Sequence, residues 1–403
     1  MTRVYNCTAQ NANTAVAVEA LREQFPADGD AIRMIFAFYD CAHDDGLLFR
    51  VLRENFPNAA IVGGTTFNGF LSDKGLYDAL SIGLLLIEDP GGDYGAASAR
   101  LNGDPAGAVQ DALQRALLSC NCAGLVPDLI CIYQVPGSEE AVIEGLRDAI
   151  GEDCPIIGGS AGDNDFSWCG RQLGPDGSLD DGIVVGVLFP STPMGFSIQS
   201  GYEPAEPNGI VTAVKQPDEQ HEATSGREII SIDNEPAAAV YNRWNNGLIE
   251  PELSQGGSIY TKAVMHPIGV NMGQLDNVDV YLTAHPAEVV PPGHLLTLCK
   301  IDVGSHVYSM SGNLNRLVAR AGLTVKRARR YLRGNQTPAG ALLLCCAGYR
   351  AATTSRLPDV ANAIAKELGA VPFITGFSFG EQGYLINRNV HCNLTIVAIV
   401  FGN

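Results

Sequence analysis

The chain has 403 residues and a formal net charge of -18 at pH 7. A hydrophobic fraction of 46% and a charged fraction of 17% are typical of a folded protein of two to three domains and exclude a disordered one. Nucleic acids and anionic membrane surfaces attract basic faces, so this acidity argues against both as partners.

The N-terminal part of the chain predicts a first strand-helix-strand unit. The apolar run 31–38 predicts a strand, and the helical stripe over 47–56 predicts a helix that begins after the cap-like Asp44. The segment 61–69 (IVGGTTFNG) predicts a buried strand that stops at a glycine-rich loop, and 80–87 predicts a closing strand.

A second unit repeats this order. Residues 129–133 predict its opening strand, and Ser138 is expected to cap a helix over 141–150. The segment 154–164 (CPIIGGSAGDN) is the second strand with a glycine-rich loop, and 182–189 is the closing strand. The repetition indicates an internal duplication of one structural unit.

A third unit lies near the C-terminal end. Strands are expected over 341–347 and 394–401, a helix over 358–368, and a third strand with a glycine loop over 373–381. The interval from opening strand to glycine is 28 positions in the first two units and 33 in the third. We place the five extra residues in a loop over 349–357.

This order predicts an α/β fold with parallel crossovers, in which the three glycine loops lie at the carboxyl ends of strands, where ligands of α/β sheets gather. The competing interpretation is that the glycines only permit tight turns. Between the second and third units the chain predicts short strands and helices, with a polar turn over 217–225. We expect a first domain over 1–195 with two units, and a second over 196–403 with this insert and the third unit.

Five segments together resemble the FIST sensory proteins, which pair a FIST N-terminal with a FIST C-terminal domain. They are 156–164, which resembles a G-G-x-A-G-D-N segment, 229–241 (IISIDNEPAAAVY), 266–270 (HPIGV), 346–350 (CAGYR) and 376–381 (GFSFGE). The resemblance spans nearly the whole chain. It departs at 63–69, where the family often has G-C-T-T-A-G-E and this chain has no acidic residue.

The resemblance implies a cytoplasmic sensory module for a small ligand, with amino acids or their derivatives as the proposed class. Backbone amides of the loops suit a carboxylate, and Asp163 or Glu381 suits an ammonium group. Alternatively, Asp163 caps the following turn and Glu381 pairs with Arg350 or Arg388. The candidate ligand-binding residues are Thr65, Thr66, Asn68, Gly158, Gly159, Ser160, Asp163, Asn164, Arg350, Gly376, Ser378 and Glu381.

A second hypothesis also follows from the resemblance, because some FIST-domain proteins are nitric-oxide-sensing haem proteins that act on histidine kinases. A b-type haem needs one axial ligand in an apolar pocket, and the candidates are His43, His266, His391 and Cys154. The chain has no C-x-x-C-H motif, which excludes covalent haem. We expect no other metal site.

A third hypothesis is an enzyme with Cys346 or Cys41 as nucleophile and His43 or His391 as base. Buried core thiols are the competing interpretation, and the chain has no H-E-x-x-H, Walker, G-x-S-x-G or dinucleotide-binding motif. We therefore expect a non-enzymatic bacterial sensor that signals through a separate partner, such as a histidine kinase. Eleven cysteines without C-x-x-C spacing, and no signal-like or membrane-length apolar run, favour the cytoplasm.

Overall fold

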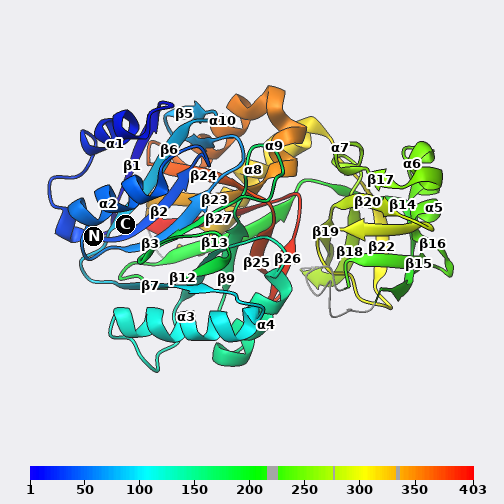
Figure 1. The fold of residues 1–403 in the computed structure, drawn as a ribbon, viewed down its shortest axis with the longest axis horizontal. Helices are drawn as coiled ribbons and strands as arrows, with labels where there is room; N and C mark the ends of the chain where they lie inside the picture. Colours follow the sequence, from blue (N-terminus) through cyan, green and yellow to red (C-terminus); the bar gives the residue numbers. More distant parts are fainter. Residues whose placement is uncertain (216–225, 276, 333–335) are drawn as a thin grey trace.

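The computed structural model describes residues 1–215, 226–275, 277–332 and 336–403, and it places them in a main body and a smaller lobe (Figure 1). The predicted turn over 217–225 lies outside the described residues. Within these ranges the main body contains three six-stranded sheets and the lobe contains one nine-stranded sheet. No helix among the described residues is long and apolar enough to cross a membrane.

The three sheets of the body each centre on the strands of one predicted unit. The first has the order β1 (Arg3–Gln10), β6 (Ser81–Glu88), β2 (Ile32–Tyr39), β3 (Ala60–Thr65), β10 (Gln172–Gly174), β11 (Gly177–Leu179). The second has β26 (Arg388–Cys392), β25 (Glu381–Leu385), β9 (Ile156–Ser160), β8 (Leu129–Gln134), β12 (Gly182–Phe189), β7 (Asp93–Arg100). The third has β13 (Met194–Ser200), β27 (Thr395–Gly402), β23 (Pro338–Cys346), β24 (Phe373–Ser378), β4 (Phe70–Ser72), β5 (Gly75–Tyr77).

The central pairs β2–β3, β8–β9 and β23–β24 are parallel, so the α/β prediction is confirmed. The closing strands β6, β12 and β27 run antiparallel to their neighbours, which makes each sheet mixed.

The hairpin that follows each glycine loop leaves its own sheet and joins the next unit. Hairpin β10–β11 of the second unit pairs with β3 of the first, and β25–β26 of the third pairs with β9 of the second. Hairpin β4–β5 of the first unit pairs with β24 of the third, which closes the cycle. Strand pairing therefore joins the three units into one body.

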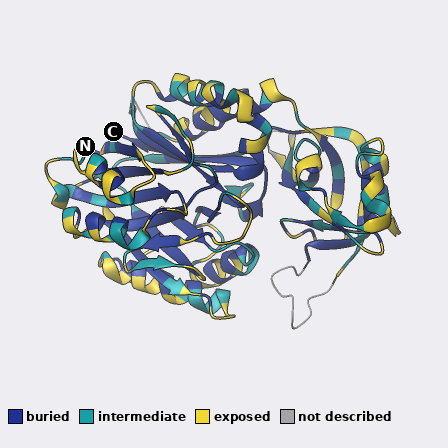
Figure 2. Cartoon of the chain, turned by 45° about the horizontal axis from the view of Figure 1, so that its top comes forward, coloured by how far each residue is buried: buried dark blue, intermediate teal, exposed yellow. Residues whose placement is uncertain are grey.

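One face of each sheet contributes to a shared apolar core, with Phe36, Phe38, Tyr133 and Leu344 among its buried side chains. Helices cover the outer faces, and exposed residues concentrate on them (Figure 2). These helices are α1 (Thr14–Arg22) and α2 (Asp45–Asn55) on the first sheet, α3 (Pro105–Ser119) and α4 (Glu139–Ile150) on the second, and α8 (Leu314–Arg329) and α10 (Leu357–Leu368) on the third.

Two local expectations differ from the structure. The five extra residues of the third unit do not form a loop: they belong to helix α9 (Ala347–Thr353) and a 3-10 turn (Thr354–Arg356), because the chain there packs into the core through buried Tyr349 and Thr353. Ser138 precedes α4 without a capping hydrogen bond from its side chain. The neighbouring Glu139 carboxylate instead accepts from Gly137 N.

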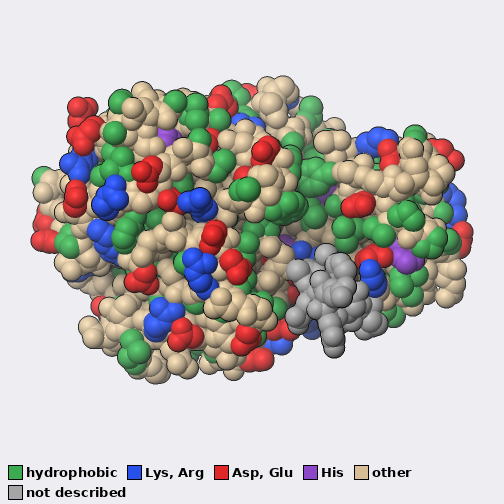
Figure 3. Space-filling view, in the orientation of Figure 1, with side chains coloured by type: hydrophobic (Ala, Val, Ile, Leu, Met, Phe, Trp, Pro, Cys, Tyr) green, Lys and Arg blue, Asp and Glu red, His purple; other side chains and the backbone are tan. Residues whose placement is uncertain are grey.

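The lobe is inserted between the second and third units. Its strands are β14 (Glu203–Val214), β15 (Glu228–Ile232), β16 (Glu235–Pro236), β17 (Gly257–Ser258), β18 (Ile268–Leu275), β19 (Val278–Ala284), β20 (Pro286–Val290), β21 (His294–Thr297) and β22 (His306–Ser311), with helices α5 (Ala237–Trp244), α6 (Glu250–Gln255) and α7 (Tyr260–Ala263). On the face drawn in Figure 3, acidic and basic side chains are interspersed over the body. That face offers no single basic surface to a polyanion.

Candidate functional site

The three glycine loops meet at one place and hydrogen-bond to one another through their backbones. Gly162 N donates to Thr65 O at 3.1 Å, which joins the second loop to the first. Phe379 N donates to Ser160 O at 2.9 Å, and Phe67 N donates to Phe377 O at 3.0 Å. The cyclic exchange of hairpins brings this convergence about, because each loop leads into a strand of the neighbouring sheet.

The threonines of the first loop hold this junction together. Thr66 Oγ1 accepts from Phe377 N at 2.8 Å and donates to Gly69 O at 2.9 Å. Thr65 Oγ1 accepts from Arg171 N at 2.9 Å. Both threonines are fully buried, so their hydroxyls act as internal links in this structure.

The glycines of the loops permit close packing. A Cβ on Gly158 would lie 2.3 Å from Ile132 O, and one on Gly159 would lie 2.8 Å from Ser378 Cβ. At Gly376 a Cβ would lie 2.6 Å from the Phe38 ring. The strands and loops approach so closely only because no side chain intervenes at these positions.

Glu381 follows the third loop, pairs with Gly159 of the second and is fully buried. Its carboxyl accepts from Ser378 Oγ at 2.8 Å and from Thr395 Oγ1 at 2.9 Å. Burial raises the pKa of Glu381 to about 8. The hydrogen bonds from Ser378 and Thr395 lower the pKa, but they offset the effect of burial only in part. The acid is therefore largely protonated at neutral pH. The expected pairing of Glu381 with Arg350 or Arg388 is wrong, because Arg350 pairs with Asp78 at 3.2 Å and neither arginine forms an ion pair with Glu381 among the described residues.

Asp163 folds the loop that follows the second glycine segment. Its Oδ2 accepts from Cys169 N at 2.9 Å and its Oδ1 accepts from Asp165 N at 3.3 Å, as the turn-capping interpretation predicts. Asn164 Oδ1 accepts from Asn68 N at 2.8 Å, so the first and second loops are also joined here. The side chain of Asp163 is buried under its own loop.

This loop carries aromatic side chains that sequence reasoning missed. Phe166 stacks on Phe379 with a centroid separation of 5.4 Å and lies 5.1 Å from Phe67. Trp168 lies 5.4 Å from Phe379, and Tyr260 of the lobe lies 5.1 Å from Phe166. We call Phe166 and Trp168 the aromatic lid. A Phe and a Trp in a polar stretch that follows a glycine loop were the available signal.

Both residues of the aromatic lid have left-handed backbone conformations, with φ of 59° at Phe166 and 61° at Trp168. Bulky residues rarely adopt this region, so the contacts of their rings must offset the strain. Phe166 is 39% and Trp168 54% exposed, which leaves them accessible from solvent.

Arg350 supplies a cation beneath this aromatic cluster. Its guanidinium carbon lies 5.3 Å from the Phe377 ring centroid and 5.8 Å from that of Phe67, and one NH2 donates to Asn68 O at 2.8 Å. Its Nε is buried without a hydrogen-bond partner among the described residues. Burial lowers the pKa of Arg350, although an arginine stays charged at neutral pH.

A second polar cluster adjoins the loops at the start of α4. Ser160 Oγ donates to Glu139 Oε1 at 2.6 Å, and Arg227 of the lobe donates to Glu139 Oε2 at 2.6 Å. Arg227 also bonds Glu140, whose other oxygen lies 2.9 Å from His391 Nδ1. Burial acts to raise the pKa values of both glutamates, but Arg227 and His391 more than offset this and hold them below their usual range.

The four candidate haem ligands have different surroundings. His43 Nδ1 is 3.1 Å from Thr14 Oγ1, and Cys154 Sγ donates to Pro127 O at 3.4 Å. His266 is partly buried at the end of the segment that follows α7, and His391 faces Glu140. None of the four lines the groove described below.

The thiols proposed as nucleophiles differ in exposure. Cys346 is buried and Cys41 is exposed. Burial raises the pKa of the Cys346 thiol well above its usual range, and it also raises that of Cys41. A thiolate is the nucleophilic form, so neither environment favours nucleophilic chemistry.

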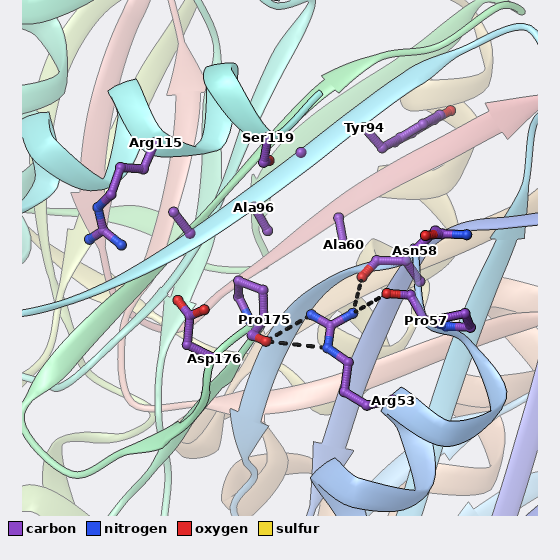
Figure 4. A pocket seen from close by; sticks show the side chains of 13 residues that line it. Arg53, Pro57, Asn58, Ala60, Tyr94, Ala96, Arg115, Ser119, Pro175 and Asp176 are labelled. Carbon is purple, nitrogen blue, oxygen red and sulfur yellow. Dashed lines mark hydrogen bonds between the residues drawn. The ribbon is translucent and has the colours of Figure 1, made fainter. Parts of the chain in front are cut away.

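A polar groove of about 380 Å³ lies between Arg53, Arg115 and Pro175 (Figure 4). Ala60, the first residue of β3, lines this groove, whereas the first glycine loop follows the last residue of β3. The groove and the loop therefore lie at opposite ends of this strand. Arg53 closes one side by donating to Pro175 O at 2.9 Å and Ala59 O at 2.7 Å. None of the predicted site residues lines it.

Three strand-helix-strand units with converging loops and an inserted lobe define a two-part α/β protein. A family model for the FIST N domain matches residues 33–235, and one for the FIST C domain matches residues 237–384. The chain therefore belongs to the FIST family, whose domains are sensory, small-ligand-binding domains of signalling proteins.

Comparison with solved structures finds matches at low sequence identity and low TM-score. A cyanuric acid hydrolase from A. caulinodans has a TM-score of 0.42 at 12% identity, with 100% of this chain and 99% of that chain covered. A chorismatase has a TM-score of 0.38 at 10% identity, with coverages of 100% and 99%. No curated protein matches the sequence.

Proposed function

We propose that the chain binds an amino acid or a derivative beneath the aromatic lid, at the junction of the three glycine loops, without turning it over. The observation that carries this proposal is the convergence of the loops under side chains of complementary chemistry. Arg350, with its unpartnered Nε, suits a carboxylate. The ring faces of Phe67, Phe166 and Phe379 suit an ammonium group or an apolar side chain.

The protonated state of Glu381 changes the role expected for it. A neutral acid in an apolar site donates a hydrogen bond, so Glu381 suits a ligand oxygen better than an ammonium group. The buried, protonated thiol of Cys346 supports binding over covalent chemistry.

The position of the aromatic lid suggests how binding is transmitted. Phe166 touches Tyr260 of the lobe, and Tyr260 lies 4.3 Å from the His285 ring. A ligand that displaces Phe166 would change this contact between body and lobe. We propose that a separate cytoplasmic signalling partner, such as a histidine kinase, recognises that change.

Tryptophan fluorescence tests the ligand site directly, because the chain has two tryptophans, Trp168 and Trp244. In a Trp244→Phe variant the emission comes from the lid. We expect a saturable change on titration with a binding amino acid, found first by thermal-shift screening, where a ligand at 100 times its Kd adds about 2.7 kcal/mol of stability.

The matched control is Trp168→Phe, which keeps Trp244 and should report no change. Arg350→Gln should weaken binding of the carboxylate. A stabilising ligand that leaves Trp168 emission unchanged would contradict a site beneath the lid.

One observation favours a haem alternative: His43 Nε2 is buried without a hydrogen-bond partner among the described residues. If haem b is bound there, reconstitution with haemin gives a Soret band that His43→Ala removes and His266→Ala keeps. An unchanged haemin spectrum after addition of the protein would rule this alternative out.

A further inference from the structure

The polar cluster at the start of α4 holds a set of groups suited to a metal ion. Ligand atoms of Glu139, Glu140 and His391 all lie within 4.8 Å of one another. The two glutamates come from the first turn of α4 and the histidine from β26, so three protein ligands converge from rigid elements. Two carboxylates and one imidazole are a donor set for divalent transition metals such as Mn²⁺ and Zn²⁺.

Buried polar atoms around this cluster lack hydrogen-bond partners among the described residues, which indicates that the cluster binds a further polar species. His391 Nε2 has no hydrogen-bond partner among the described residues, although the side chain is only 1% exposed. A Cβ on Gly380 would lie 2.6 Å from this nitrogen and 3.6 Å from Glu139 Oε1, so both atoms face the same glycine.

Gln382 adds two more unpartnered atoms. It is fully buried, lies directly across from His391 in the β25–β26 pair, and neither its amide oxygen nor its amide nitrogen is paired within the described part of the chain. A buried polar group left unpaired is costly, because it has lost its hydrogen bonds to water without gaining others. An additional polar species beside His391 and Gln382 would relieve that cost.

We propose that Glu139, Glu140 and His391 form a binding site for a divalent transition-metal ion, which competes with Arg227 for the two glutamates. Glu140 is 25% exposed in its side chain and gives the ion a route from solvent. Its carboxylate also accepts from Lys300 N at 2.8 Å, which fixes its orientation from the lobe.

Arg227 is the resident cation of the cluster. It is 7% exposed and bonds both glutamates, so it offsets one of the two negative charges that attract an ion. An incoming ion must displace this guanidinium, which lowers its affinity. The competition gives the site a signature that an adventitious surface site lacks: loss of Arg227 must strengthen metal binding.

The test is a titration of the full chain with Mn²⁺, with free ion counted by its electron paramagnetic resonance signal. Mn²⁺ is chosen because it prefers carboxylate and imidazole ligands to the thiolates of this cysteine-rich chain. We expect one ion per chain, at least ~10-fold weaker binding in Glu140→Gln and His391→Gln, and at least ~10-fold tighter binding in Arg227→Met.

Glu144→Gln is the matched control, because Glu144 lies on the same helix, one turn further along, and is exposed. It should bind as the unsubstituted chain does. Circular dichroism checks that each variant is folded, and if Arg227→Met does not fold, the contrast between Glu140→Gln and Glu144→Gln decides alone. Mn²⁺ that stays free at millimolar concentration, or binding that Glu140→Gln leaves unchanged, would overturn the proposal.

Discussion

Ser160 Oγ donates a 2.6 Å hydrogen bond to Glu139 Oε1 and so ties the second glycine loop to the first turn of α4. Both residues are buried. Removing the hydroxyl in Ser160→Ala leaves a buried carboxylate with one donor fewer, and a hydrogen bond to a charged group contributes roughly 1.5–3 kcal/mol. We expect a loss of that size in the free energy of unfolding, measured with urea.

Ser254→Ala is the control for this measurement, because the Ser254 hydroxyl makes only an exposed bond to Pro251 O. Its stability should stay within about 0.5 kcal/mol of the unsubstituted chain. An equal loss in the free energy of unfolding of both variants would show that the Ser160–Glu139 hydrogen bond contributes no more to stability than an exposed one.

Glu381 predicts a pH dependence of stability. Its folded pKa is about 8, whereas the ordinary value is 4.5. Between these values the folded state keeps a proton that the unfolded state has lost, so stability falls as pH rises, by at most about 1.4 kcal/mol per pH unit from this group. Glu381→Gln resembles the protonated acid and should remove this contribution.

The comparison requires unfolding curves at several pH values between 5 and 8 for both proteins. Glu144→Gln, at an exposed position, should keep the slope of the unsubstituted chain. If Glu381→Gln shows the same slope as well, the carboxyl is ionised in the folded protein and the assignment of a neutral acid is wrong.

Gly376 tests the close packing beneath the loops. A Cβ there would lie 2.6 Å from the Phe38 ring in the shared core, and overpacking of a core costs typically about 1–3 kcal/mol. We expect Gly376→Ala to lower the midpoint of urea unfolding accordingly. Gly46→Ala in α2 meets the side chains of Asp44 at 3.3 Å and Arg50 at 3.9 Å and no core atom, so we expect a smaller effect than at Gly376, since alanine also favours helix.

The repeated units could be predicted from the sequence because their determinants are local. An apolar run, a helical stripe and a glycine-rich loop lie within about forty residues of one another in each unit. The exchange of hairpins could not be predicted. Strands such as β10 and β4 span three residues each, and such short sequences indicate a hairpin without indicating which sheet edge it joins.

The candidate site, like the fold, could be predicted from the sequence only where local patterns determine it. Glycine loops and Asp163 could be found from local patterns, and the capping of the turn by Asp163 follows from its neighbours. The aromatic contact between Phe166 and Tyr260 joins residues far apart in the sequence. Likewise, the raised pKa of Glu381 depends on burial by the whole body, which no local pattern encodes.

The pair Arg227–Glu139 provides a last prediction, on the link between body and lobe. Both side chains are buried and their closest atoms are 2.6 Å apart, so loss of Arg227 leaves the buried Glu139 carboxylate without its ion-pair partner, at a cost of about 3–5 kcal/mol. Loss of Glu139 costs less, because Arg227 keeps its pair with Glu140. We expect Arg227→Met to destabilise strongly and Glu139→Gln to destabilise by a smaller amount. The double variant should lose less than the sum of the single losses, because it leaves no buried charge from this pair unpaired. Urea unfolding of the four proteins measures the coupling, and additive losses would mean that the two residues act independently.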